Sequence, residues 1–235
     1  MRKILRGFRC AALVGAALLG VVSARAEQVY YRDSAGEKRS AECYVVENFD
    51  PLLVPSFYSG EWYAVKGKDI NRGAIKVSGS AHLILCDGAS LTANGSQVKF
   101  PAIILEQGAS LTIYGQDEGT GKLVAIGGER CAGIGCRNSL SEVHGAGDLT
   151  ICGGNIVATG GRCAAGIGGS MFWDGFPSPS ADYGNGGKVE IYGMMKNVLV
   201  SLGWDENKIY DVGGYWYYEG KNSVNIKKTI DGKKN

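Results

Sequence analysis

The stretch from Gly108 to Gly135 reads GASLTIYGQDEGTGKLVAIGGERCAGIG, and the stretch from Ala146 to Gly168 reads AGDLTICGGNIVATGGRCAAGIG. Both copies hold a Leu-Thr strand pattern, a second apolar pattern that ends in Gly-Gly, and a closing Gly-Ile-Gly. Self-similarity at a fixed spacing is the sequence signature of repeat architectures. This repeat therefore decides which fold we expect.

The spacing of the copies is nearly constant. Leu111, Leu149 and Val189 begin three copies of the first pattern, 38 and then 40 residues apart. The second pattern recurs at an offset of 33, from Lys122–Gly128 to Asn155–Gly161. The offset is smaller because the turn before the second pattern is shorter in the second copy.

Each unit reads as strand, turn, strand, glycine-rich corner and loop. No 3.6-residue periodicity follows the first 26 residues, so helices are not expected. Between Gly108 and Gly187, 21 of 80 residues are glycine, several times the average of about 7%. The sequence predicts an all-β right-handed parallel β-helix, a solenoid with short, degenerate terminal units. A β-sandwich with a duplicated hairpin and a β-prism are the alternatives.

Residues 1–26 have the features of a cleavable secretory signal peptide. The start is basic, an apolar run extends from Ala11 to Val22, and Ala24-Arg25-Ala26 forms a small-x-small cleavage site. The run is shorter than the ~20 residues that a membrane span needs. We expect cleavage after Ala26 and a chain that is secreted or held at the cell surface.

The mature chain is slightly acidic. Without residues 1–26 it holds 20 Lys and Arg against 23 Asp and Glu, a net charge of −3. We therefore expect no nucleic-acid partner. We also expect no membrane span after signal removal and no cofactor, and the oligomeric state is left open.

The mature chain is divided into three segments. Residues 27–75 are interpreted as amino-terminal strands or a cap, and residues 76–193 as the β-helix repeat region. Residues 194–235 are interpreted as a degenerate last unit with a carboxy-terminal cap, because the terminal units of repeat arrays are atypical.

Six cysteines remain, an even number in an exported chain, so disulfides are expected candidates. Cys131 and Cys163 each follow an arginine and are taken as equivalent positions of successive units. Equivalent strands stack about 4.8 Å apart, a spacing that suits a disulfide. Cys131–Cys136 and an unbridged ladder of small buried side chains are the alternatives. No metal site is predicted, because His82 and His144 lie far from the cysteine pairs in sequence.

Aromatic residues gather in a few loops. Trp173 and Asp174 interrupt the repeat, and Trp216 and Tyr217 lie in GGYWYYEG near the end. Aromatic faces stack on sugar rings while a carboxylate accepts hydroxyl hydrogen bonds. These four residues are the candidate ligand-binding residues, for a glycan or a surface protein. Capping of the solenoid ends is the alternative for the last pair and the favoured interpretation of Trp62.

No catalytic residues are predicted. A glycosidase needs two carboxylates about 5–9 Å apart across a cleft. The acids of this chain fall in turns and loops, and Glu129 has no acidic counterpart in the second copy. A fold that hosts enzymes elsewhere does not by itself establish an activity.

Several motifs resemble those of a known group. WYAV (Trp62–Val65), HLILCDGASLTA (His82–Ala93), the run from Ser110 to Gly128, and AGIG are similar to secreted bacterial proteins with glycine-rich AGIGGG repeats. The segment Tyr30–Val46 is similar too, and the resemblance covers residues 28–193. It implies an exported β-solenoid or adhesin-like surface protein, and it brings no catalytic residues.

The expected function is that of an exported, non-enzymatic β-solenoid, structural or adhesive at the bacterial cell surface or outside it. The alternative is a carbohydrate-binding module, or a pectin lyase-like enzyme that acts on polysaccharides, on the same scaffold. The resemblance ends at Gly193, because the residues that follow lack the repeat motif.

Overall fold

A computed structural model describes residues 22–47, 54–137, 146–161, 164–170, 188–192, 195–201, 212–213 and 224–225. The described residues form strands and no helix, which confirms the all-β class. Accordingly, this part of the chain holds no helix with the length and apolar character to cross a membrane.

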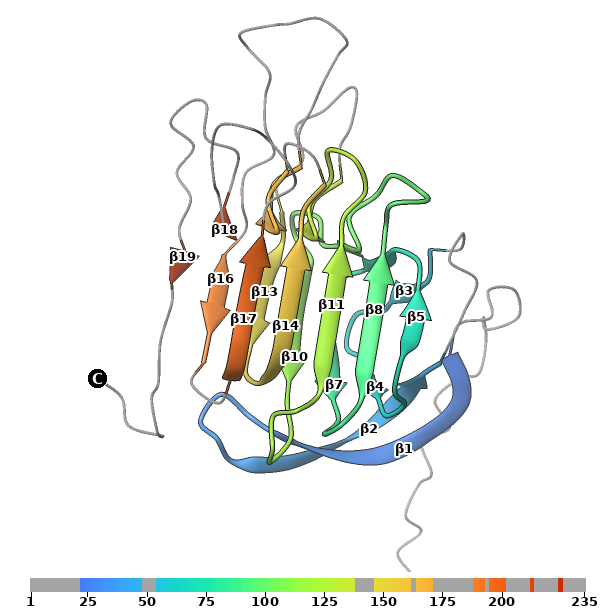
Figure 1. Ribbon diagram of the computed structural model, residues 1–235. Coiled ribbons are helices and arrows are strands. Elements are labelled where there is room, and N and C mark those ends of the chain that lie inside the picture. Colours follow the sequence, from blue (N-terminus) through green and yellow to red (C-terminus); the bar gives the residue numbers. More distant parts are fainter. Residues whose placement is uncertain are drawn as a thin grey trace, which may run out of the picture.

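The strands form three sheets (Figure 1). The first sheet runs β1 (Val22–Arg32), β2 (Lys38–Val46), β4 (Trp62–Val65), β7 (Ser80–Leu85), β10 (Ser110–Tyr114), β13 (Asp148–Ile151), β16 (Val189–Ile191) and β19 (Val224–Asn225). The second runs β17 (Met195–Ser201), β14 (Gly154–Thr159), β11 (Lys122–Ile126), β8 (Ser90–Asn94) and β5 (Ile70–Arg72). The third runs β18 (Val212–Gly213), β15 (Ile167–Gly168), β12 (Ile134–Gly135), β9 (Ile103–Ile104), β6 (Ile75–Val77) and β3 (Ser56–Phe57).

From β4 to β18 the chain visits the first, second and third sheets in the same order on every pass. Neighbouring strands of successive passes pair in parallel, and among the described strands only β1 and β2 pair antiparallel. A sandwich built from antiparallel hairpins would not give this pattern.

The register of the strands reproduces the sequence repeat. Leu111 of β10 pairs with Leu149 of β13, and Leu149 pairs with Val189 of β16. Lys122 of β11 pairs with Asn155 of β14. The offsets counted along the sequence are therefore those of the ladders, because each repeat contributes one strand to each sheet.

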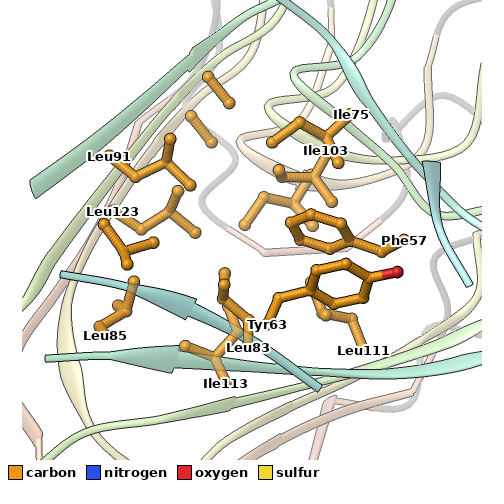
Figure 2. Close-up of a cluster of buried hydrophobic side chains, with 14 of the residues drawn as sticks. Phe57, Tyr63, Ile75, Leu83, Leu85, Leu91, Ile103, Leu111, Ile113 and Leu123 are labelled. Atoms are coloured by element: carbon orange, nitrogen blue, oxygen red, sulfur yellow. The ribbon is translucent and has the colours of Figure 1, made fainter. Parts of the chain in front are cut away.

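Alternating side chains of all three sheets meet in one core. Figure 2 shows Leu91 and Leu123 of the second sheet opposite Ile75 and Ile103 of the third, with Leu83 and Leu111 of the first sheet in the lower part of the cluster. Each of these side chains is fully buried. Burial of a leucine or isoleucine stabilises the fold by about 1.5–3 kcal/mol, so the stack of passes is held by a continuous core.

The glycine-rich corners let successive passes approach closely. A Cβ added at Gly161 would lie 1.7 Å from the carbonyl oxygen of Gly128, its counterpart one pass earlier. Between these corners, Arg130 has a φ of 61°, a left-handed conformation that residues other than glycine seldom adopt. The corners therefore depend on the backbone and not on large side chains.

The parallel pairing of strands begins before residue 76, the residue at which the sequence predicts the start of the repeat region. Ser56 of β3 pairs with Lys76 of β6, and Trp62 of β4 pairs with His82 of β7. These first strands lack the glycine-rich sequence pattern of the later copies. The sequence repeat therefore does not identify them as part of the parallel sheets.

The β1–β2 hairpin lies across the ends of the first-sheet strands (Figure 1). The backbone N–H of Arg32 donates to the carbonyl of Gly115 at 3.0 Å, and Nε2 of Gln116 donates to the carbonyl of Tyr30 at 2.9 Å. The outer edge of β1 is therefore partly hydrogen-bonded to the body of the protein, which limits its pairing with other chains. Cleavage after Ala26 would leave the paired stretch from Glu27 in place.

Candidate functional site: an aromatic cluster under the hairpin

Four rings from four strands form the aromatic cluster: Tyr31 of β1, Trp62 of β4, His82 of β7 and Tyr114 of β10. Parallel pairing sets Trp62 opposite His82. The residue after each of these two is fully buried in the core. Because side chains alternate along a strand, both rings lie on the outer face of the first sheet.

Trp62 packs face to face with His82 and Tyr114, while the Tyr31 ring of the hairpin meets its neighbours at a tilt. The centroids of Trp62 and His82 are 4.1 Å apart with planes at 13°, and those of Trp62 and Tyr114 are 5.1 Å apart at 22°. Tyr31 approaches Trp62 to 4.8 Å and Tyr114 to 4.5 Å. The hairpin is thus in contact with the sheet through Tyr31, whose ring lies at 34° to that of Trp62 and at 54° to that of Tyr114. Aromatic pairs of this kind contribute about 0.5–1.5 kcal/mol each beyond burial.

A hydrogen bond joins His82 and Tyr114 within the cluster. Nδ1 of His82 lies 3.2 Å from the hydroxyl of Tyr114. Burial lowers the pKa of His82 and raises the pKa of Tyr114, because a low-dielectric site disfavours the charged form of each. A neutral imidazole with its proton on Nε2 accepts this bond from Tyr114.

Polar rows continue the cluster along the outer face of the first sheet. The hydroxyl of Ser110 donates to the hydroxyl of Ser80 at 2.8 Å, across neighbouring strands. Register places residues of successive strands side by side about 4.8 Å apart. The row through Ser80 continues with Ser110 and Asp148, and the row through His82 continues with Thr112, Thr150 and Glu190.

Gln116 links the hairpin to two successive corners. Its Oε1 accepts from the backbone N–H of Asp87 at 2.9 Å, while its Nε2 donates to Tyr30. Beside it, Asp117 pairs with Arg32 at 2.6 Å and with Lys38 at 3.2 Å. Both cations hold the pKa of Asp117 below its usual value. These ion pairs are largely exposed, so each contributes little, and Gln116 is the better-buried anchor.

The outer face of the second sheet differs in chemistry. Val124 and Val157 pair across β11 and β14, and Thr92 of β8 continues their row. Ile126 pairs with Thr159 in the next row. These side chains are partly exposed. They present β-branched side chains in place of aromatic rings, beside a polar row formed by Ser90, Lys122 and Asn155.

The residues predicted to bind a ligand fall outside the described part of the chain: Trp173, Asp174, Trp216 and Tyr217. Their role stays a prediction. Trp62, interpreted as an end cap, lies on the outer face of β4 in contact with Tyr31. It therefore supports the hairpin from within the first sheet.

Two registers fix how the glycine-rich corners correspond. Lys122 pairs with Asn155, and Ile134 pairs with Ile167. Both pairs are 33 residues apart, so the corner between them has the same length in both passes and no residue is inserted.

This constant offset makes Ala164 the counterpart of Cys131. Cys131 N donates to the carbonyl of Gly128 at 3.0 Å, and Ala164 N donates to that of Gly161 at 3.1 Å. The assumed equivalence of Cys131 and Cys163 is therefore wrong by one residue. Cys163 lies outside the described residues, so the disulfide itself stays a prediction.

Several of the described acidic groups are engaged in turns or ion pairs. Asp87 accepts from the backbone N–H groups of Glu118 and Thr120, and Glu129 pairs with Arg130 at 4.0 Å. Within the described ranges, no three His, Cys, Asp or Glu side chains gather as a metal site would require.

The sequence reasoning missed the cluster members other than Trp62. Tyr31, His82 and Tyr114 stand far apart in the chain, and each is an ordinary strand residue. One signal was available: His82 and Tyr114 sit at outward positions of strands whose inward positions are aliphatic.

Comparison with protein-family models, with curated proteins and with solved structures finds no match. The function is therefore inferred from the residues and their arrangement.

Proposed function

We propose that this chain is an exported, non-enzymatic right-handed parallel β-helix that acts as a structural or adhesive protein at the bacterial cell surface or outside it. One observation carries the proposal: the chain traverses three parallel sheets in a fixed order around one core. The right hand is that of nearly all parallel crossovers. A rigid stack of this kind offers long, regular faces for contact.

Two features of the sequence support export. Residues 1–26 have the features of a signal peptide. The motifs between residues 28 and 193 resemble those of secreted bacterial AGIGGG-repeat proteins. Both point to a chain that is secreted or held at the cell surface.

The arrangement of acidic groups favours a non-enzymatic role. Asp33 accepts from the N–H groups of Ala35 and Glu37, and Asp117 is held by two cations. Such carboxylates stabilise turns and are not poised as an acid–base pair.

Fractionation of cells that express the tagged chain tests this proposal. The expected result is a chain on the cell surface or in the medium, with the mass of a product that begins at Glu27. An unprocessed chain in the cytoplasm would contradict export. Sustained cleavage of pectin or another polysaccharide by the purified chain would contradict the non-enzymatic role.

A second candidate function is carbohydrate binding. It is favoured by the rows of Ser, Thr and carboxylate side chains on the outer face of the first sheet, since such groups form hydrogen bonds with sugar hydroxyls. A glycan array with the wild type, Trp173→Ala and Thr150→Ala locates the site. Loss with Trp173→Ala alone places it in the loop, loss with Thr150→Ala alone places it on the sheet, and no binding by the wild type removes this candidate.

A further inference from the structure

The expected cleavage bond, between Ala26 and Glu27, lies inside β1 and not in a loop ahead of the first strand. Ala26 is the register partner of Tyr44 on β2. Glu27 is the partner of Cys43 on the same strand. β1 also pairs with β2 upstream of the bond, at Val22, and downstream as far as its last residue. The backbone on both sides of this bond is therefore already engaged by β2.

The strand that faces the bond is fixed to the body of the protein. Tyr44 pairs in turn with Tyr63 of β4, which is fully buried. Cys43 is fully buried as well, and Val29, two residues beyond Glu27, belongs to the same hydrophobic core. The backbone around the bond therefore becomes free only when the hairpin leaves buried contacts, which requires local unfolding.

The first residue after the bond is also held through its side chain. Nζ of Lys66, in the corner that follows β4, donates to a carboxylate oxygen of Glu27. Extended peptides are recognised through main-chain hydrogen bonds and through pockets for alternate side chains. Both kinds of group are used by the folded protein at this bond, so the closed hairpin withholds it from a peptidase.

We propose that a signal peptidase cleaves the Ala26–Glu27 bond only before the hairpin closes, so that signal removal precedes the pairing of β1 with β2. The inference rests on the proposed export through a cleavable signal. Hydrolysis adds water across the amide and leaves a carboxylate on Ala26 and an ammonium group on Glu27. Closure then pairs Glu27–Arg32 with Lys38–Cys43. A precursor that folds first keeps its signal peptide.

An order-of-addition experiment on the full precursor tests this sequence of steps. The chain of residues 1–235 is unfolded in urea and diluted into mild detergent, and a purified bacterial signal peptidase is added either at once or after refolding. Mass spectrometry measures the fraction of product that begins at Glu27. We expect cleavage on immediate addition and at least about tenfold slower cleavage after refolding, because cleavage then follows the population of the open hairpin.

Variants of Glu42 separate the hairpin from the rest of the fold. Glu42 is exposed and lies opposite Gln28. Glu42→Pro removes a backbone N–H and disfavours pairing within the hairpin, so the refolded precursor should be cleaved nearly as fast as the unfolded one. Glu42→Ala removes the same side chain, keeps the backbone donor, and should stay as resistant as the wild type. Protected amides in β11 show that the body of each variant is folded.

A second variant covers the case in which Glu42→Pro does not refold. Tyr31→Ala removes ring contacts of the hairpin without a change in the backbone and should speed cleavage of the refolded precursor several-fold. Resistance of every refolded hairpin variant would overturn the inference, because the protection would then lie outside the hairpin.

The wild type distinguishes failure of the inference from failure of its basis. Equal rates of cleavage before and after refolding would overturn the order of steps and leave the signal peptide in place. An unfolded precursor that is not cut at this bond, by a peptidase that cuts a control precursor, would overturn the export signal together with the inference.

Discussion

The outer faces of the first and second sheets are built on the same inward pattern and differ outward. Inward, both carry leucine, isoleucine and alanine in register, such as Leu111 with Leu149 and Leu123 with Ile156. Outward, the first sheet carries aromatic rings, hydroxyls and carboxylates, while the second carries valine, isoleucine and threonine beside a polar row of Ser90, Lys122 and Asn155. The inward residues form the core that holds successive repeats together. The outward residues determine which groups each sheet can contact.

The strongest test of this division is in the shared core. Leu111→Ala removes a fully buried side chain and should lower the free energy of unfolding by about 2–5 kcal/mol. Its neighbour Thr112 points outward, so Thr112→Ala should change it by only about 0.5 kcal/mol. Denaturant titration measures both, and equal losses would contradict the assignment of inward and outward positions.

The next effect separates the two faces. Tyr31→Ala removes the hairpin ring that touches Trp62 and Tyr114, and we expect a loss of about 1–3 kcal/mol. The loss should be local, with faster exchange in β1 and β2 and unchanged exchange in β11. Uniformly faster exchange would show that the hairpin is part of the global folding unit.

The smallest effect concerns the second sheet. Val124→Thr places on β11 the residue type that Thr92 already supplies in the same row. Both side chains are β-branched, and the site is partly exposed, so the change should be below about 1 kcal/mol. A larger loss in denaturant titration would reveal a covering contact on this face. Val157→Thr, in the same row, serves as the matched control.

The sequence offsets between repeats predicted the register of the paired strands, because each repeat contributes one strand to each sheet. The offsets of 38 and 33 appear as the pairs Leu111–Leu149 and Lys122–Asn155. The same offsets correct the equivalence of the cysteines. An alignment of the two Arg-Cys pairs shifts the corner by one residue, because the constant offset of 33 pairs Cys131 with Ala164 and not with Cys163.

The aromatic cluster could not be derived from the sequence. Tyr31 and Tyr114 are 83 residues apart, and they meet because an antiparallel hairpin crosses the ends of parallel strands. No repeat relates the hairpin to the later passes. Local patterns predict which strands form, while this contact depends on where an element outside the repeat packs.

The central claim is that successive repeats stack in parallel and in register, and engineered disulfides test it most directly. Thr112 and Thr150 pair on the outer face of the first sheet, and parallel neighbours about 4.8 Å apart fall within the Cα range of disulfides. The double variant Thr112→Cys with Thr150→Cys should cross-link on mild oxidation, as measured by mass and by mobility without reductant. Thr112→Cys with Val157→Cys, on different sheets, is the matched control and should not cross-link. Cross-linking of the control, or failure of the in-register pair, would contradict the stacked arrangement.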